Sequence, residues 1–217
     1  MIDFAAARRH MVDGQLRPNR VTSTGLLDAM GEVPRELFVP AGSRSIAYVD
    51  EDLALGNGRF LIEPLTFARL VQAAAPQRYD TALDVGGATG YSSAVLARLC
   101  ASVVSLEHDK VLGDLAVAAL RQLGIDTVEQ VSGPLAEGHL KRAPYNVILI
   151  NGAVDEAPAA LLGQLAEGGR LASVIGTGPV GRATLFTKRR GVASPRVLFD
   201  AVVPPLKDFA REPSFVF

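Results

Sequence analysis

Apolar and polar positions follow two different patterns along this chain, and the change comes near residue 80. Before that point, apolar residues recur at helical spacing, which predicts helices over 4–17, 23–30 and 65–75. The stretch 41–63 shows little periodicity and contains several glycines, so it predicts a long ordered loop or a short hairpin. The N-terminal part therefore reads as a helical segment that carries one long loop.

After residue 80, short apolar runs alternate with helical patterns. The runs predict strands over 81–85, 102–106, 127–131, 145–150, 170–175, 184–188 and 197–203. The helical patterns cover 92–100 and 110–123, and a third is expected from Pro158 to Gly168. This alternation predicts an α/β fold of the Rossmann-like kind, with a mostly parallel sheet and helices on both faces.

The length fits one domain with a sizeable core. Within it we expect two parts, an N-terminal helical segment with a substrate loop over 1–79 and a Rossmann-like core over 80–217. No internal repeat or flexible linker separates them.

The candidate chemistry lies where the first core strand ends. Asp84 stands in that strand, and Gly86, Gly87 and Gly90 follow it directly before a helical pattern. Glycines allow a tight turn and let a ligand approach the backbone. Glu107 ends the next predicted strand about 20 residues later, where nucleoside-binding folds hold ribose hydroxyls. The pattern predicts a nucleoside cofactor.

Two cofactor classes fit this turn. A dinucleotide favours Gly-x-Gly-x-x-Gly, whose third glycine is missing, although 87–90 reads Gly-Ala-Thr-Gly as in some NADP-binding reductases. S-adenosylmethionine carries no phosphate, and Asp84 fits its amino group. The turn favours S-adenosylmethionine over NADP. A convincing catalytic tyrosine–lysine pair for a reductase is absent from the sequence.

Charge and composition limit the classes of binding partner, metal site and cellular compartment that we expect. The net charge of −1 gives no electrostatic reason to expect nucleic acid. A single cysteine, Cys100, forms no intrachain disulfide and suits a reducing, cytoplasmic setting, and no apolar run reaches the ~18 residues that span a bilayer. His10, His108 and His139 lack ligand spacing, so no metal site is expected, and the acids at 50–52 are expected to be solvated.

Several segments resemble the protein-L-isoaspartate O-methyltransferase family. The most specific is Val-Pro-Arg-Glu-Leu-Phe-Val-Pro at 33–40, supported by Ala-Tyr-Val-Asp at 47–50, Leu-Asp-Val-Gly at 83–86 and Ala-Pro-Tyr-Asn at 143–146. Gln-Leu at 164–165, followed by Gly-Gly-Arg-Leu at 168–171, continues the series in family order. The chain is identified as a member of this family.

The resemblance implies an S-adenosylmethionine-dependent enzyme that methylates the α-carboxylate of isoaspartyl residues in damaged proteins. It assigns Asp84 and the three glycines to the methionine tail and Glu107 to the ribose. Residues 58–62 form the wall between cofactor and substrate. The cofactor contacts expected beyond those are Phe60, Leu61, His108, Ser132 and Gly133.

The active-site loop departs from the family pattern. The family's Gly-Gln-Thr-Ile-Ser-Gln-Pro aligns with 58–64, which puts Ile62 at the position of the catalytic serine. Losing a hydrogen bond to a charged acceptor costs roughly 1.5–3 kcal/mol, or about 10- to 100-fold in rate. Glu63 would repel a substrate carboxylate. We expect Arg59 to offset this charge, either by pairing with Glu63 or by binding the substrate.

A further departure affects the adenine. The family's Gly-Asp-Gly aligns with Gly133-Pro134-Leu135, so Pro134 replaces the acid that contacts the adenine amine. These substitutions lead to the hypothesis that the fold is retained while isoaspartyl repair is weakened or replaced. The alternatives are a methyltransferase with another acceptor and a catalytically silent binding or regulatory protein on the same fold.

Overall fold

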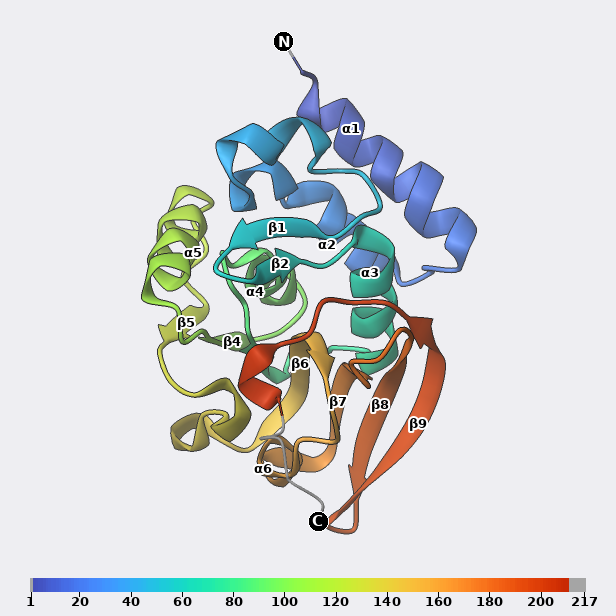
Figure 1. Cartoon of the computed structure of the whole chain (residues 1–217), viewed down its shortest axis with the longest axis vertical. Coiled ribbons are helices and arrows are strands. Elements are labelled where there is room, and N and C mark those ends of the chain that lie inside the picture. Colours follow the sequence, from blue (N-terminus) through green and yellow to red (C-terminus); the bar gives the residue numbers. More distant parts are fainter. Residues whose placement is uncertain (1, 211–217) are drawn as a thin grey trace, which may run out of the picture.

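The computed structural model describes residues 2–210. At its centre lies a seven-stranded sheet in the order β5-β4-β3-β6-β7-β8-β9, and a small hairpin, β1-β2, lies apart from it (Figure 1). The strands are β1 (Leu53–Gly56), β2 (Arg59–Leu61), β3 (Thr81–Val85), β4 (Ser102–Leu106), β5 (Val128–Val131), β6 (Tyr145–Val154), β7 (Leu165–Ile175), β8 (Gly181–Arg189) and β9 (Val192–Ala201).

Six α-helices are formed by the described residues. They are α1 (Phe4–His10), α2 (Thr24–Glu32), α3 (Pro64–Ala74), α4 (Tyr91–Ala97), α5 (Lys110–Gln122) and α6 (Ala159–Gly163). The first predicted helix continues past α1 as a π-helical turn, Met11–Leu16, and a 3-10 turn, Arg17–Asn19, which contains the helix-breaking Pro18. The predicted helices over 23–30 and 65–75 are confirmed as α2 and α3.

The central strands β3, β4 and β6 bury both of their faces. Ala82 of β3 belongs to a hydrophobic cluster with α2, α3 and α4, whereas its neighbour Leu83 belongs to a second cluster with Leu161 of α6. Alternate residues of a strand point to opposite faces of the sheet. The continuously apolar runs therefore reflect helices packed on both sides, which confirms the predicted α/β class.

The last two strands depart from the parallel arrangement. β3, β4, β5, β6 and β7 pair in parallel, but β7 pairs antiparallel with β8 and β8 antiparallel with β9. Only Arg190 and Gly191 connect β8 to β9, both at positive φ, as in a type I′ hairpin turn. A connection this short rules out a parallel crossover.

The prediction of a helix from Pro158 to Gly168 is wrong. α6 ends at Gly163, and β7 begins at Leu165. The side chain of Gln164 donates to the Glu137 carbonyl at 2.7 Å, and the Gln164 carbonyl accepts from the Tyr145 amide at 2.9 Å. These long-range bonds draw the chain into the sheet, whereas the proline at 158 and the glycine at 168 predicted one helix between them.

The weakly periodic stretch 41–63 contains a 3-10 helix, Ala41–Ile46, and the β1-β2 hairpin. The expectation of a short hairpin is confirmed. Across the part of the chain that is described, no helix combines the length and apolar character needed to cross a bilayer.

Gly90 provides a test of the packing between the glycine turn and α5. Its φ is +94°, and a Cβ built on it would lie 2.9 Å from the Cβ of Ala116. We expect Gly90→Ala to lower the free energy of unfolding by about 1–3 kcal/mol from overpacking alone, measured by urea denaturation.

Gly163→Ala is the matched control, because a Cβ there meets no atom within 4 Å. It should change the free energy of unfolding by less than about 1 kcal/mol. Equal values for the two variants would contradict the packing described for Gly90.

Candidate active site

The site lies at the carboxyl ends of β3, β4 and β6. From β3 the chain adds β4 and β5 on one side, and it then returns to add β6 on the other side of β3. The strand order therefore reverses between β3 and β6. Loops diverge at such a point and leave a crevice, which is where open α/β sheets bind ligands. In Figure 1 the β1-β2 hairpin and the final 3-10 turn, Lys207–Phe209, lie on either side of this edge.

The glycine turn brings backbone close to buried polar side chains. Gly86 has a φ of +70°, and a Cβ on Gly87 would lie 2.8 Å from the Ser105 hydroxyl and 2.9 Å from Asp84 Oδ2. Any side chain at position 87 would displace these groups. The turn therefore requires glycine for close approach as well as for conformation.

Asp84 is fully buried and bound on both oxygens. Its Oδ2 accepts from the hydroxyls of Ser92 and Ser93 at the start of α4, and its Oδ1 accepts from the Asn151 amide at 2.7 Å. Burial raises the pKa of the Asp84 carboxyl, and these three donors oppose that rise. The sequence reasoning singled out Asp84 but missed all three partners.

Glu107 is only 1% exposed, and its carboxylate accepts three backbone hydrogen bonds and makes two contacts with the Arg59 guanidinium. Its Oε2 accepts from the Ala88 amide at 2.9 Å, and its Oε1 accepts from the amides of His108 and Asp109 at 3.0 and 3.1 Å. The remaining contacts come from Arg59. The carboxylate expected to hold a ribose is fully satisfied by the chain itself.

Arg59, the first residue of β2, reaches across the site. Its Nη1 donates to Glu107 Oε1 at 3.1 Å, its Nη2 lies 3.0 Å from Glu107 Oε2, and Nη2 also donates to the Gly86 carbonyl at 2.9 Å. The side chain is 6% exposed. The expected pairing of Arg59 with Glu63 is wrong, because a buried guanidinium finds its compensating charge on Glu107 instead.

Ile62 is buried at the end of the hairpin. Its carbonyl accepts from Nη2 of Arg35 at 2.7 Å, and Nε of Arg35 donates to the Ala47 carbonyl at 2.8 Å. Arg35 is fully buried and stacks over the Tyr91 ring, 4.9 Å from its centre, and burial lowers the pKa of its guanidinium. The motif around Arg35 is recognisable in the sequence, but the sequence does not predict that Arg35 holds the hairpin edge through these bonds.

Phe60, Leu61 and Ile62 share one small space with the glycine turn, Tyr91 and Asn151. Its volume is about 10 Å³, roughly the room for one water molecule. The expected wall between cofactor and substrate is thus packed tightly against the turn.

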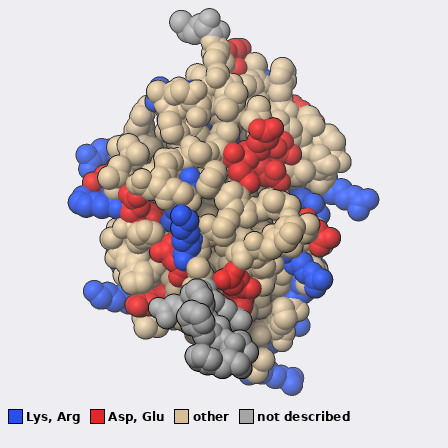
Figure 2. Space-filling view, viewed as in Figure 1, with Lys and Arg blue, Asp and Glu red and all other residues tan. Residues whose placement is uncertain are grey.

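Glu63 belongs to an acidic cluster with Asp50 and Asp52. Asp52 accepts from the Glu63 amide at 2.8 Å, Asp50 accepts from the Leu65 amide at 2.9 Å, and the Glu63 carboxylate accepts from the Thr66 hydroxyl. Figure 2 shows acidic side chains gathered where the loop before β1 meets the start of α3. Asp50 and Asp52 therefore hold the loop to the helix. Asp50 and Glu51 are exposed, as expected of solvated acids, whereas Asp52 is half-buried.

The expected adenine contacts lie beside the C-terminal segment. Nδ1 of half-exposed His108 is 2.8 Å from Asp208, and Ser132 and Gly133 follow β5. Leu135, two residues on, is fully buried in the cluster that also contains Leu206. No group of three residues able to hold a metal ion occurs among residues 2–210.

The Arg59–Glu107 pair should contribute strongly to stability. Arg59→Met leaves the buried carboxylate with only backbone donors, so the free energy of unfolding should fall by about 3 kcal/mol, near the lower end for breaking a buried pair. Urea denaturation measures the change. Arg142→Met is the matched control, since Arg142 pairs with Glu129 on the surface, and it should cost less than about 1 kcal/mol. Similar losses in both variants would contradict the buried pair.

The acidic cluster predicts a pH effect. Burial raises the pKa of Glu63 above its ordinary 4.5, and the negative charges of Asp50 and Asp52 add to the rise. The hydrogen bond from Thr66 opposes it. The folded state therefore holds the proton more tightly than the unfolded state, and stability falls as pH rises from 4.5 through the folded pKa. Glu63→Gln removes this titration. We expect the stability difference between variant and wild type to shift in favour of the variant from pH 4 to pH 7 in urea denaturation, and a pH-independent difference would contradict it.

The comparisons with known proteins agree on one family. The family model described as Protein-L-isoaspartate(D-aspartate) O-methyltransferase (PCMT) matches residues 6–204. A protein-L-isoaspartate O-methyltransferase of Koribacter versatilis is 36% identical over 203 residues, covering 94% of this chain and 91% of the relative. One from Methylorubrum populi is 40% identical over 187 residues, covering 86% and 87%.

Solved structures show the same fold. A protein-L-isoaspartate O-methyltransferase is 26% identical with a TM-score of 0.80, covering 92% of this chain, which spans 65% of that protein's length. A putative enzyme of this kind from Plasmodium falciparum, in complex with S-adenosyl-L-homocysteine, is 19% identical with a TM-score of 0.80 and covers 93% of this chain and 98% of its own. With a family match over most of its length and relatives above 30% identity, this chain belongs to the protein-L-isoaspartate O-methyltransferase family.

Proposed function

We propose that this chain is an S-adenosylmethionine-dependent carboxyl O-methyltransferase acting on isoaspartyl residues of proteins. The observation that carries the proposal is the family match over residues 6–204, which includes the buried acids Asp84 and Glu107 at the ends of neighbouring strands. Family membership also favours S-adenosylmethionine over the NADP alternative that the glycine turn left open. A location in the cytoplasm is supported by the single, buried Cys100.

The residue types at the strand ends fit the cofactor. Asp84 and the glycines at 86, 87 and 90 would hold the methionine tail, and Glu107 would hold the ribose, with Ser132, Gly133 and His108 near the base. The cofactor supplies an activated methyl group when bound. The substrate carboxylate is already a nucleophile, so the protein contributes placement and exclusion of water rather than acid–base chemistry.

The N-terminal part is proposed to serve the substrate. The hairpin edge at 58–62 lies against the glycine turn of the core, and Arg35 ties this edge to the preceding 3-10 turn. The family serine position is Ile62, whose side chain has no group able to donate a hydrogen bond. No step of the transfer is assigned to Ile62.

A second candidate function follows from the acidic cluster. Asp50, Asp52 and Glu63 lie together beside the hairpin edge, where they would repel an anionic acceptor by roughly 1–4 kcal/mol for each charge within about 4 Å. A less anionic acceptor, or a binding role without transfer, suits this charge better than isoaspartate does.

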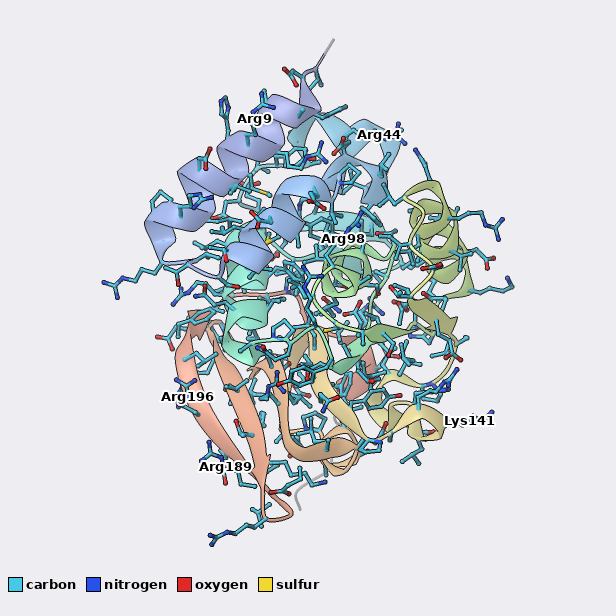
Figure 3. All side chains as sticks on the ribbon, turned by 180° about the vertical axis from the view of Figure 1, so that it is seen from behind. Arg9, Arg44, Arg98, Lys141, Arg189 and Arg196 are labelled. Atoms are coloured by element: carbon cyan, nitrogen blue, oxygen red, sulfur yellow. The ribbon has the colours of Figure 1, made fainter. Side chains whose placement is uncertain are left out.

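Nucleic acid is not part of the proposal. The basic side chains labelled in Figure 3, Arg9, Arg44, Arg98, Lys141, Arg189 and Arg196, come from different elements and lie apart from one another. A dispersed set of this kind gives little support to binding a polyanion, which favours a basic patch or stripe.

Restoring the hydroxyl tests the proposed reaction. The purified protein is assayed for methyl ester formation on an isoaspartyl peptide with S-adenosylmethionine. If the reaction occurs, Ile62→Ser should raise the rate by about 10- to 100-fold, because a hydroxyl bond to a charged group is regained.

Ile62→Ala is the matched control, since it removes a similar volume without adding a hydroxyl. It should not raise the rate. Ester formation at the isoaspartyl site supports the first function. Cofactor binding without ester formation in wild type and Ile62→Ser would favour the second.

A further inference from the structure

We propose that this chain carries a built-in latch over its nucleoside site, formed by Arg59 and by a strap consisting of Pro204–Phe209. The inference rests on the proposed function, because it concerns how S-adenosylmethionine would enter. In the latched state Arg59 binds the carboxylate of Glu107, which is expected to hold the ribose, and the strap covers the adjoining glycine turn. Cofactor binding then requires both to move.

Arg59 and ribose compete for the same atoms. Both oxygens of Glu107 already face the two terminal nitrogens of Arg59, at 3.0 and 3.1 Å. A carboxylate that also accepts three backbone amides has no direction left for ribose hydroxyls. The guanidinium further binds the Gly86 carbonyl, so it lies against the glycine turn as well.

The strap is fixed to the end of β6 by backbone bonds. The Ala153 amide donates to the Pro204 carbonyl at 3.0 Å, and the Leu206 amide donates to the Ala153 carbonyl at 2.8 Å. Pro205 forms a parallel bridge with Ala153. In Figure 1 the segment after β9 crosses the sheet edge and ends in a turn beside β6. The strap is thus bound along the end of β6 at the mouth of the site by a single isolated bridge.

Leu206 fills the space beside the glycine turn. Its side chain is 4% exposed and lies 2.5 Å from the Cβ position of Gly152 and 3.3 Å from that of Gly86. Only glycine at position 152 permits this approach. Leu206 also packs in one cluster with Leu135, which follows the expected adenine loop. An apolar side chain of the protein therefore occupies the neighbourhood expected for the nucleoside.

Two further contacts connect the strap and the hairpin to the Glu107 loop. Asp208 lies 2.8 Å from Nδ1 of His108, and Asn57 at the hairpin tip donates to Asp109 at 2.7 Å. At the same tip, a Cβ on Gly58 would lie 3.7 Å from the Lys207 side chain. Hairpin, strap and ribose loop are therefore in mutual contact, so opening one weakens the support of the others.

A latch of this kind lowers apparent affinity without changing the site itself. The measured dissociation constant equals the intrinsic constant divided by the open fraction. Variants that weaken the latch should therefore bind the nucleoside more tightly, whereas variants that merely damage the site should bind it less tightly. This opposite sign separates a latch from a structural role.

The experiment measures binding of S-adenosylhomocysteine, the unreactive product of methyl transfer, by calorimetry on the full chain. Leu206→Ala and Arg59→Met should each bind at least about tenfold more tightly than wild type. Val202→Ala is the matched control, because Val202 lies just before the strap and is 66% exposed. It should bind like wild type. Leu206→Ala retains the Arg59–Glu107 pair, so the test survives if Arg59→Met fails to fold.

Hydrogen exchange gives a readout independent of turnover. Ligand binding should increase exchange at the Leu206 amide and throughout the strap, because the bonds to Ala153 break. Greater protection of the strap on binding would overturn the latch and make the strap a closing lid.

The outcomes separate the two proposals. Binding by wild type with equal or weaker binding by both variants overturns the latch and leaves the proposed function intact. No binding by wild type or by either variant at millimolar ligand overturns both. Tighter binding with no methyl ester on an isoaspartyl peptide supports the latch while contradicting the proposed acceptor.

Discussion

Glu107 presents a carboxylate at the end of β4 where water does not reach it, and much of the site is arranged around keeping that charge satisfied. Three backbone amides converge on it from the glycine turn and from the start of the loop that follows β4. The positive charge comes from Arg59, 48 residues earlier in the sequence. A lysine there would not replace it, because the contact uses two nitrogens of one planar fork and a third acceptor at Gly86.

A second buried guanidinium, that of Arg35, holds the N-terminal segment to the core. Arg35 is fully buried and donates to the carbonyls of Ala47 and Ile62. It also stacks on Tyr91, at the start of the helix that follows the glycine turn. One guanidinium thus connects the loop, the hairpin edge and the core. Arg35, within the motif at 33–40, thereby holds the end of the hairpin from which Arg59 reaches Glu107.

Local pattern predicted most of the sheet and the outline of the site. β3, β4, β5 and β6 could be read from apolar runs, and Asp84, Glu107 and the glycines from their spacing. The partner of Arg59 could not, because it depends on how a hairpin folds over a distant strand, and neighbouring Glu63 was the nearer carboxylate. The early end of α6 could not be predicted for the same reason, since Gln164, which caps the helix, also bonds to Glu137 and Tyr145 far away in the sequence. Where tertiary bonds compete with local preference, the sequence pattern carries no sign of the outcome.

The strap follows every strand of the sheet in the chain, since β9 ends at Ala201 and the strap begins at Pro204. During synthesis the ribosome therefore completes β3, β4 and β6, with the crevice between them, before Leu206 exists. In a chain that folds as it emerges, the crevice stays open to small molecules until the strap leaves the ribosome. A nucleoside bound in that interval would meet no competitor from Leu206, whereas one arriving later would. The history of the molecule, and not only its composition, would then decide which state is populated first.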